Sequence, residues 1–95
     1  MSDFIKKFIE EAREFIAQIE TSLLSLEENP KNANLIDEIF RYMHSLKGSG
    51  GMFGFDNISS FTHHLETLFD EVRSGNLALN NQIIEITYQS VYLLK

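Results

Sequence analysis

One stretch of the sequence, residues 41–54, combines residue types that could do chemistry. It holds His44, then Lys47 three positions later, then Gly48 at the start of a run of small residues. Each glycine inside a helix costs about 1 kcal/mol relative to alanine. Glycines beside a His/Lys pair therefore indicate a face stripped of side chains, so that another protein or a phosphate can come close to His44.

The composition restricts the class of protein. The chain has 95 residues, 43% of them apolar and eight of them phenylalanine, which suits one domain with an aromatic-rich core. The net charge is -6 and the eight basic residues are scattered, which argues against binding of nucleic acid or an anionic membrane. The absence of cysteine excludes disulfides and thiolate metal sites and fits the cytoplasm. No apolar run is long enough for a signal peptide or for insertion into a membrane.

Four segments repeat apolar residues at spacings of three and four, the pattern of amphipathic helices. The second segment continues through the glycines to Phe53. In order, the segments cover about residues 2–28, 32–53, 57–74 and 80–94. Because the connections are short, the sequence predicts an all-α, antiparallel up-down four-helix bundle with His44 on the second helix.

Polar residues and glycines predict the helix ends. The expected N-caps are Ser2 or Asp3, Asn32 or Asn34, Asp56 or Asn57, and Asn80 or Asn81. Gly75 is expected to end the third helix in a left-handed conformation. On that helix the apolar stripe is expected to comprise Ile58, Phe61, Leu65, Leu68 and Val72.

The turn between the second and third helices, centred on Phe55, predicts which residues face each other. His44 lies eleven residues before Phe55 and Glu66 eleven after it, while Lys47 and His63 each lie eight away. In an antiparallel pair, residues equidistant from the turn lie at the same height. At about 100° per residue, His44 and Glu66 fall on the flanks of the apolar stripes that share one seam. We therefore expect them to meet at the solvent edge of that seam.

Such a pair supports a defined chemistry. A carboxylate that accepts a hydrogen bond from Nδ1 of the imidazole leaves Nε2 unprotonated and exposed as a nucleophile. Lys47, one turn along, would neutralise a phosphoryl group on Nε2. Ser45 points outward, and with Gly48 and Gly51 it forms the expected surface for a docking partner. Together these features describe a phosphoryl carrier.

The residues of this site also carry a family resemblance. The run from His44 to Gly51, followed by Phe53-Gly54-Phe55, resembles the phosphoacceptor motif of histidine-containing phosphotransfer (HPt) domains, most closely the N-terminal domain of CheA-type chemotaxis histidine kinases. The similarity continues through the residues Thr62 to Glu66, Leu68, Asp70-Glu71, Arg73, Gly75 and Leu79-Asn80.

The resemblance implies a role in two-component signalling. His44 would be phosphorylated, with Glu66, Lys47 and His63 around it and His63 as a hydrogen-bond neighbour. The phosphate would come from the ATP- and Mg-using catalytic domain of a histidine kinase and pass to an aspartate of a response-regulator receiver domain. The domain itself would bind no cofactor and would be a transfer intermediate, not an enzyme. We expect residues 1–95 to form one domain, the N-terminal fragment of a longer multidomain kinase, because the chain stops within an apolar helical pattern.

Two other hypotheses remain open. An adaptor bundle that only binds partner helices would not need His44, Lys47 or the bare face. A metal site formed by His44, His63 and Glu66 would need ligands within about 2.0–2.2 Å of one ion, and Lys47 would repel the cation. Gly50 lies on the apolar stripe and is expected to serve close helix packing.

Overall fold

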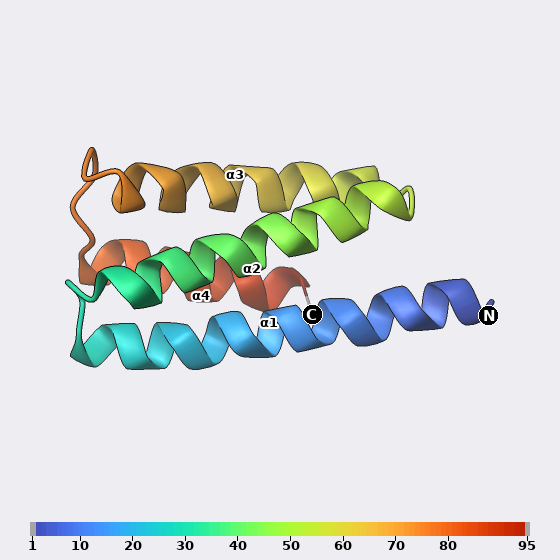
Figure 1. Ribbon diagram of the computed structural model, residues 1–95, viewed down its shortest axis with the longest axis horizontal. Coiled ribbons are helices and arrows are strands. Elements are labelled where there is room, and N and C mark those ends of the chain that lie inside the picture. Colours follow the sequence, from blue (N-terminus) through green and yellow to red (C-terminus); the bar gives the residue numbers. More distant parts are fainter. Residues whose placement is uncertain (1, 95) are drawn as a thin grey trace.

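The computed structural model describes residues 2–94, so Met1 and Lys95, the residue at which the chain stops, lie outside it. These residues form four helices and no strand: α1 (Asp3–Glu28), α2 (Ala33–Met52), α3 (Asp56–Arg73) and α4 (Asn81–Leu94). Consecutive helices run in opposite directions along the long axis (Figure 1). The predicted antiparallel four-helix bundle is confirmed.

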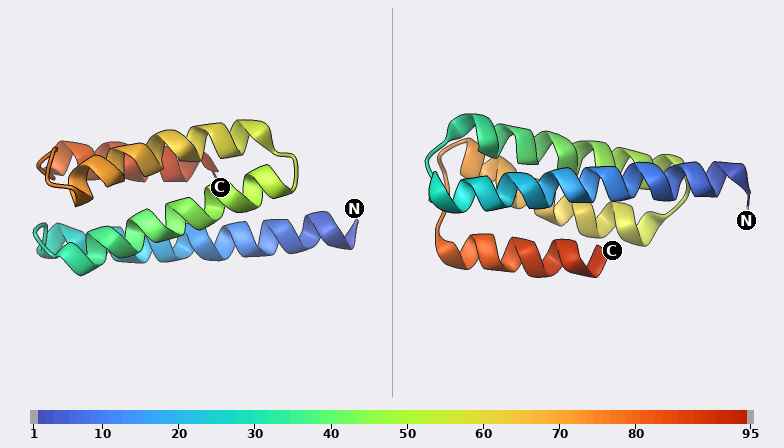
Figure 2. Two further views of the ribbon diagram at one scale, coloured as in Figure 1. Left: turned by 45° about the horizontal axis from the view of Figure 1, so that its top comes forward. Right: turned by 90° about the horizontal axis from the view of Figure 1, so that it is seen from below.

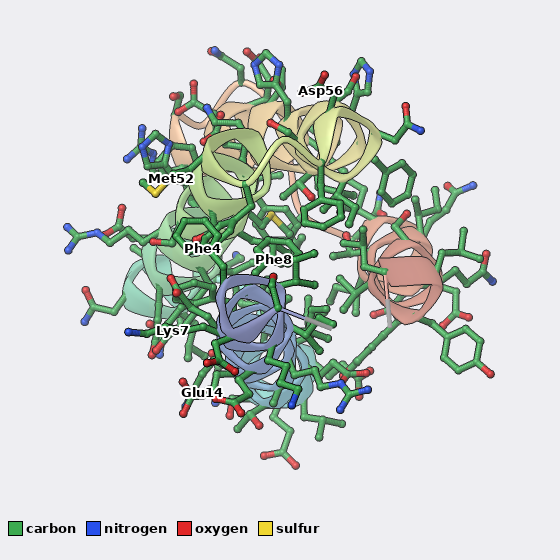
Figure 3. The ribbon with its side chains drawn as sticks, turned by 90° about the vertical axis from the view of Figure 1, so that its right-hand side faces the viewer. Phe4, Lys7, Phe8, Glu14, Met52 and Asp56 are labelled. Carbon is green, nitrogen blue, oxygen red and sulfur yellow. The ribbon has the colours of Figure 1, made fainter. Side chains whose placement is uncertain are left out.

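Helix α2 lies between α1 and α3 and contacts both, whereas α4 packs mainly on α1. Turning the molecule shows α4 beside α1 at the lower edge of the right-hand view, away from α2 (Figure 2). Seen along the bundle, the helices surround one core, and Phe8 lies on the inner side of α1 (Figure 3). Helix α2, which carries His44 and Lys47, is thus packed against both α1 and α3.

Three helices begin at N-caps that the sequence predicted. Oγ of Ser2 accepts a hydrogen bond from the amide of Ile5, and Oδ1 of Asn80 accepts one from that of Ile83. Oδ1 of Asn32 accepts from two amides, which fixes the start of α2. Such caps satisfy amides that have no partner inside the helix.

The predicted cap of α3 is wrong. Neither Asp56 nor Asn57 caps this helix, because it begins at Asp56 and its N-cap is Phe55, which has no side-chain cap. The ring of Phe55 stacks on Phe8 of α1 at 4.7 Å between centroids, and its amide donates to the carbonyl of Gly50. Ring packing and a backbone hydrogen bond therefore fix the start of α3, and a polar cap is not needed.

Each of the two hairpin helices, α2 and α3, is followed by a glycine in the left-handed conformation. After α2, Gly54 has φ 80°, and its amide and that of Phe55 close back on the last turn. After α3, Gly75 has φ 81° and the same pair of bonds forms, as predicted for this residue. This closure satisfies carbonyls that a helix end would otherwise leave open. It also makes the turn around Phe55 tight, which sets the register of α2 against α3.

The buried face of α3 differs from the predicted stripe. Phe69, which was not assigned to the stripe, is fully buried, whereas Leu68 is only half-buried. The buried residues of α3 are Thr62, Leu65, Glu66, Phe69 and Val72. At about 100° per residue, this face is rotated from the predicted one by roughly 60° toward Glu66. The rotation draws Glu66 into the seam between α2 and α3.

No helix within residues 2–94 has a stretch that is long and apolar enough to cross a lipid bilayer.

Candidate functional site

His44 and Glu66 meet across the seam between α2 and α3. Nδ1 of His44 lies 2.5 Å from Oε2 of Glu66, which confirms the contact predicted from their equal spacing about Phe55. The side chain of His44 is 64% exposed and that of Glu66 only 10%. The expectation that both lie at the solvent edge is therefore wrong for Glu66, because the rotated face of α3 carries the carboxylate inward.

Lys47 completes the cluster from α2. Its Nζ donates a hydrogen bond to Oε1 of Glu66 at 2.8 Å, so the two oxygens of the carboxylate serve two different partners. The sequence placed Lys47 on the same side as His44 but did not assign it to Glu66. A side chain one turn beyond His44 can reach the same carboxylate because residues three apart share a helix face.

The charge of Glu66 decides the tautomer of His44. Burial is the largest single influence and acts to raise the pKa of Glu66, but hydrogen bonds and charge from Lys47 and His44 outweigh it and hold this pKa below its usual value. Glu66 is therefore a carboxylate at neutral pH, and a carboxylate can only accept hydrogen bonds. Nδ1 of His44 must then carry the proton, which leaves Nε2 of the neutral imidazole with its lone pair free.

His63 takes no part in this cluster. Its ring lies beside that of His64, with 6.4 Å between centroids and an angle of 19°, and its side chain makes no hydrogen bond to His44, Lys47 or Glu66 within residues 2–94. His63 and Lys47 are equidistant from Phe55, but Lys47 turns to the buried carboxylate instead. The hydrogen-bond role given to His63 therefore has no support in this arrangement.

The position of His63 also argues against a metal site formed by His44, His63 and Glu66. Residues 2–94 contain no group of three histidine or acidic side chains that could share an ion. His63 is outside the cluster, and the ammonium group of Lys47 occupies the second oxygen of Glu66.

The glycines of α2 divide into two kinds. A Cβ added to Gly48 would meet nothing within 4 Å among residues 2–94, whereas one added to Gly50 would lie 3.3 Å from the amide nitrogen of Ser59 in α3. The side chain of Ser59 also donates a hydrogen bond to the carbonyl of Lys47. Gly50 thus lets α3 pack closely on α2, as expected, while the absence of a side chain at Gly48 leaves open surface next to His44.

Ser45 and Gly51, the other predicted surface residues, are exposed. A Cβ on Gly51 would make only an ordinary contact, 3.5 Å from Oγ of Ser59. Together with Gly48 they border His44 with small groups, which fits the predicted docking surface.

Comparison with known proteins decides the family. The model of the Hpt domain family matches residues 3–95. The chain belongs to the Hpt domain family. In three dimensions it is similar to the CheA phosphotransferase domain from Thermotoga maritima, with a TM-score of 0.93, 29% identity, and coverage of 99% of this chain and 91% of that one.

Sequence relatives of this Hpt domain are much longer proteins. It is 39% identical over 88 residues to the chemotaxis protein CheA of Borreliella burgdorferi and 42% identical over 86 residues to that of Salmonella typhimurium. These matches cover 93% and 90% of the chain but only 10% and 13% of the relatives' lengths.

The ring contact of His44 with Phe40, and the contact of Phe40 with Arg73, were not predicted from the sequence. Phe40 packs on the core as an ordinary residue of an apolar stripe would, but its ring also stacks beside the imidazole of His44. Arg73, in the last turn of α3, lies over Phe40 and pairs with Asp37. The pairing of Asp37 with Arg73 could have been predicted from the turn, since both residues are 18 positions from Phe55.

Proposed function

We propose that this domain carries a phosphoryl group on Nε2 of His44. The observation that supports the proposal is the contact of Nδ1 with the carboxylate of Glu66 beneath an imidazole that is 64% exposed. That contact fixes the tautomer, orients the ring and turns the nucleophilic nitrogen to solvent. The bare surface at Gly48 allows a partner to reach it.

Each transfer step breaks one bond to phosphorus and forms another. In uptake, the lone pair of Nε2 attacks the γ-phosphorus of ATP, and the bond to the bridging oxygen breaks so that ADP leaves with its electron pair. In delivery, a carboxylate oxygen of a receiver-domain aspartate attacks the same phosphorus, and the electrons of the P–N bond return to Nε2. Throughout, Glu66 holds the proton on Nδ1, and Lys47 offers positive charge near the phosphoryl oxygens.

The partners and setting of this function belong to the same proposal. A histidine kinase catalytic domain would supply ATP and Mg, and a response-regulator receiver domain would accept the phosphate, so the domain alone is a transfer intermediate and not an enzyme. The names of the relatives, chemotaxis protein CheA and CheA phosphotransferase domain, support a place in chemotaxis-like two-component signalling in the cytoplasm. A longer parent chain with kinase activity is consistent with the lengths of those relatives.

The test is phosphorylation with ATP, Mg and a CheA-type kinase core. We expect phosphate that is labile in acid and stable in alkali, absent from His44→Gln, and transferred to a receiver domain. Because His44 is exposed, His44→Gln should change the free energy of unfolding by less than about 0.5 kcal/mol. Binding of partners without any phosphate on the parent domain would favour the adaptor hypothesis, and phosphate on another residue at the parental rate would contradict the assignment of His44.

A further inference from the structure

Phe40 lies one helical turn before His44 on α2, and its ring faces the imidazole. The two ring centroids are 6.3 Å apart and the planes meet at 24°. Helical side chains lean toward the N-terminus of their helix, which carries the ring of His44 over residue 40. Phe40 is half-buried and packs on the core, whereas the side chain of His44 is largely exposed. One flank of the exposed imidazole therefore rests on an anchored aromatic ring.

Arg73 of α3 holds that aromatic ring from the neighbouring helix. Its guanidinium carbon lies 3.9 Å from the centroid of the Phe40 ring, the geometry of a cation–π contact. The guanidinium is held by Asp70 at 2.7 Å and by Asp37 at 3.4 Å. The hydrogen bond to Asp70 is the main cause that raises the pKa of Arg73, and Asp37 adds to it, so the cation persists at any physiological pH.

We propose that Phe40, held by Arg73, is a positioning residue for the imidazole of His44; the inference rests on the proposed phosphoryl-carrier function. The hydrogen bond from Nδ1 to Glu66 fixes one atom of the ring, about which the ring can still swing. The stacked ring of Phe40 removes this freedom. Nε2 then faces solvent in a direction that is set before a partner docks, which lowers the entropic cost of reaching the reactive geometry.

The substitution Phe40→Leu tests the proposal because leucine is apolar and helix-forming but has no planar face. Phe61→Leu is the matched control, since Phe61 is also half-buried and packs on the same core but has no ring contact with His44 among residues 2–94. Relaxation of the imidazole C–H bonds and the χ1 couplings of His44 report ring order by NMR without any phosphate. We expect order to fall in Phe40→Leu, to stay at the parental value in Phe61→Leu, and to return in Phe40→Tyr.

Arg73→Gln tests the link from the other helix. Arg73 touches the ring of Phe40, so we expect its loss to lower the order of His44 in the parent and to have no further effect in the Phe40→Leu background. Because Arg73 is exposed, Arg73→Gln leaves the core intact. It therefore tests the positioning of His44 even if Phe40→Leu lowers the stability of the domain. A loss of order that is equal in both backgrounds would show that Arg73 acts by another route.

The kinetic test uses ATP, Mg and a CheA-type kinase core. The maximal rate of phosphorylation should fall about two- to ten-fold in Phe40→Leu, the range expected when one side chain must be immobilised during reaction instead of beforehand. KM for the domain should not change, because the docking surface is intact. Parental order and rate in Phe40→Leu, or equal losses in Phe61→Leu, overturn the positioning role. A parent domain that takes up no phosphate overturns the function itself, while the order of the ring still decides whether Phe40 holds it.

Discussion

Asp37 of α2 pairs with Arg73 of α3, 3.4 Å between Oδ1 and Nη1, at the same register that joins His44 to Glu66. Each of these pairs is equidistant from Phe55 in the sequence. Two contacts 7 residues apart along α2 that obey one rule show that the hairpin keeps its register from the site toward the open end. The tight turn at Gly54 therefore determines which acidic side chain reaches the histidine.

Replacing Lys47 tests its role toward the phosphate. Lys47→Ala removes a cation one helical turn from His44 and one of the two donors to Glu66. We expect both uptake from a kinase core and delivery to a receiver domain to slow by roughly ten-fold or more, the effect of losing a charged hydrogen bond. Lys47→Arg keeps the charge and serves as control. Equal single-turnover rates for the alanine variant and the parent would mean that Lys47 only holds Glu66.

Gly48 tests the docking surface. Leucine is a better helix residue than glycine by about 0.8 kcal/mol, and a Cβ at position 48 would meet no atom of residues 2–94 within 4 Å. Gly48→Leu should therefore raise the unfolding midpoint slightly and slow transfer with both protein partners. Phosphoramidate, a small donor that needs no docking, provides the control and should react at the parental rate. Unimpaired transfer to proteins would contradict the role of the bare face.

A comparison of two alanine variants separates the roles of the glycines. Gly48→Ala should gain about 0.5–1 kcal/mol from helix propensity. Gly50→Ala places a Cβ 3.3 Å from a backbone nitrogen of α3, and a backbone atom cannot move away as the end of a flexible side chain could. The gain in stability from helix propensity should therefore be cancelled or reversed in this variant. Urea unfolding of the two variants measures the difference. Equal stabilisation by both would show that the α2–α3 contact relaxes freely.

The sequence could predict the four helices and the contact between His44 and Glu66 because local rules determine both. Polar caps and glycines mark the helix ends, and the turn at Phe55 fixes the heights of residues on α2 and α3. It could not predict which face of α3 is buried, since Leu68 and Phe69 are adjacent and either can continue an apolar stripe.

Packing against the other helices resolves that choice. Thr62 joins the buried face because its hydroxyl bonds to the carbonyl of Ile58 at 2.7 Å, which a count of apolar residues does not register. The same rotation explains why Glu66 is buried and why Lys47 turns inward to meet it. The stacking of Phe40 with His44 and Arg73 was missed for a related reason: aromatic residues in a helical stripe are ordinarily assigned to the core.

The ionisation of Glu66 should make the stability of the domain depend on pH. Its pKa in the folded domain lies below its ordinary value of 4.5, so between these two values the unfolded chain binds more protons than the folded one. The stabilisation from ionised Glu66 is therefore fully present above about pH 4.5 and is lost as the pH falls through the folded pKa.

Glu66→Gln lacks this titration. The difference in unfolding free energy between the parent and Glu66→Gln should be constant near neutrality and shrink on acidification. Glu11→Gln, at a half-buried carboxylate that accepts a hydrogen bond from Ser49, serves as control. In Glu66→Gln, nitrogen NMR of the imidazole should show the Nδ1–H tautomer of His44 losing its preference. A pH-independent difference together with an unchanged tautomer would show that the cluster does not lower the pKa of Glu66 and that its carboxylate does not direct Nε2 to solvent.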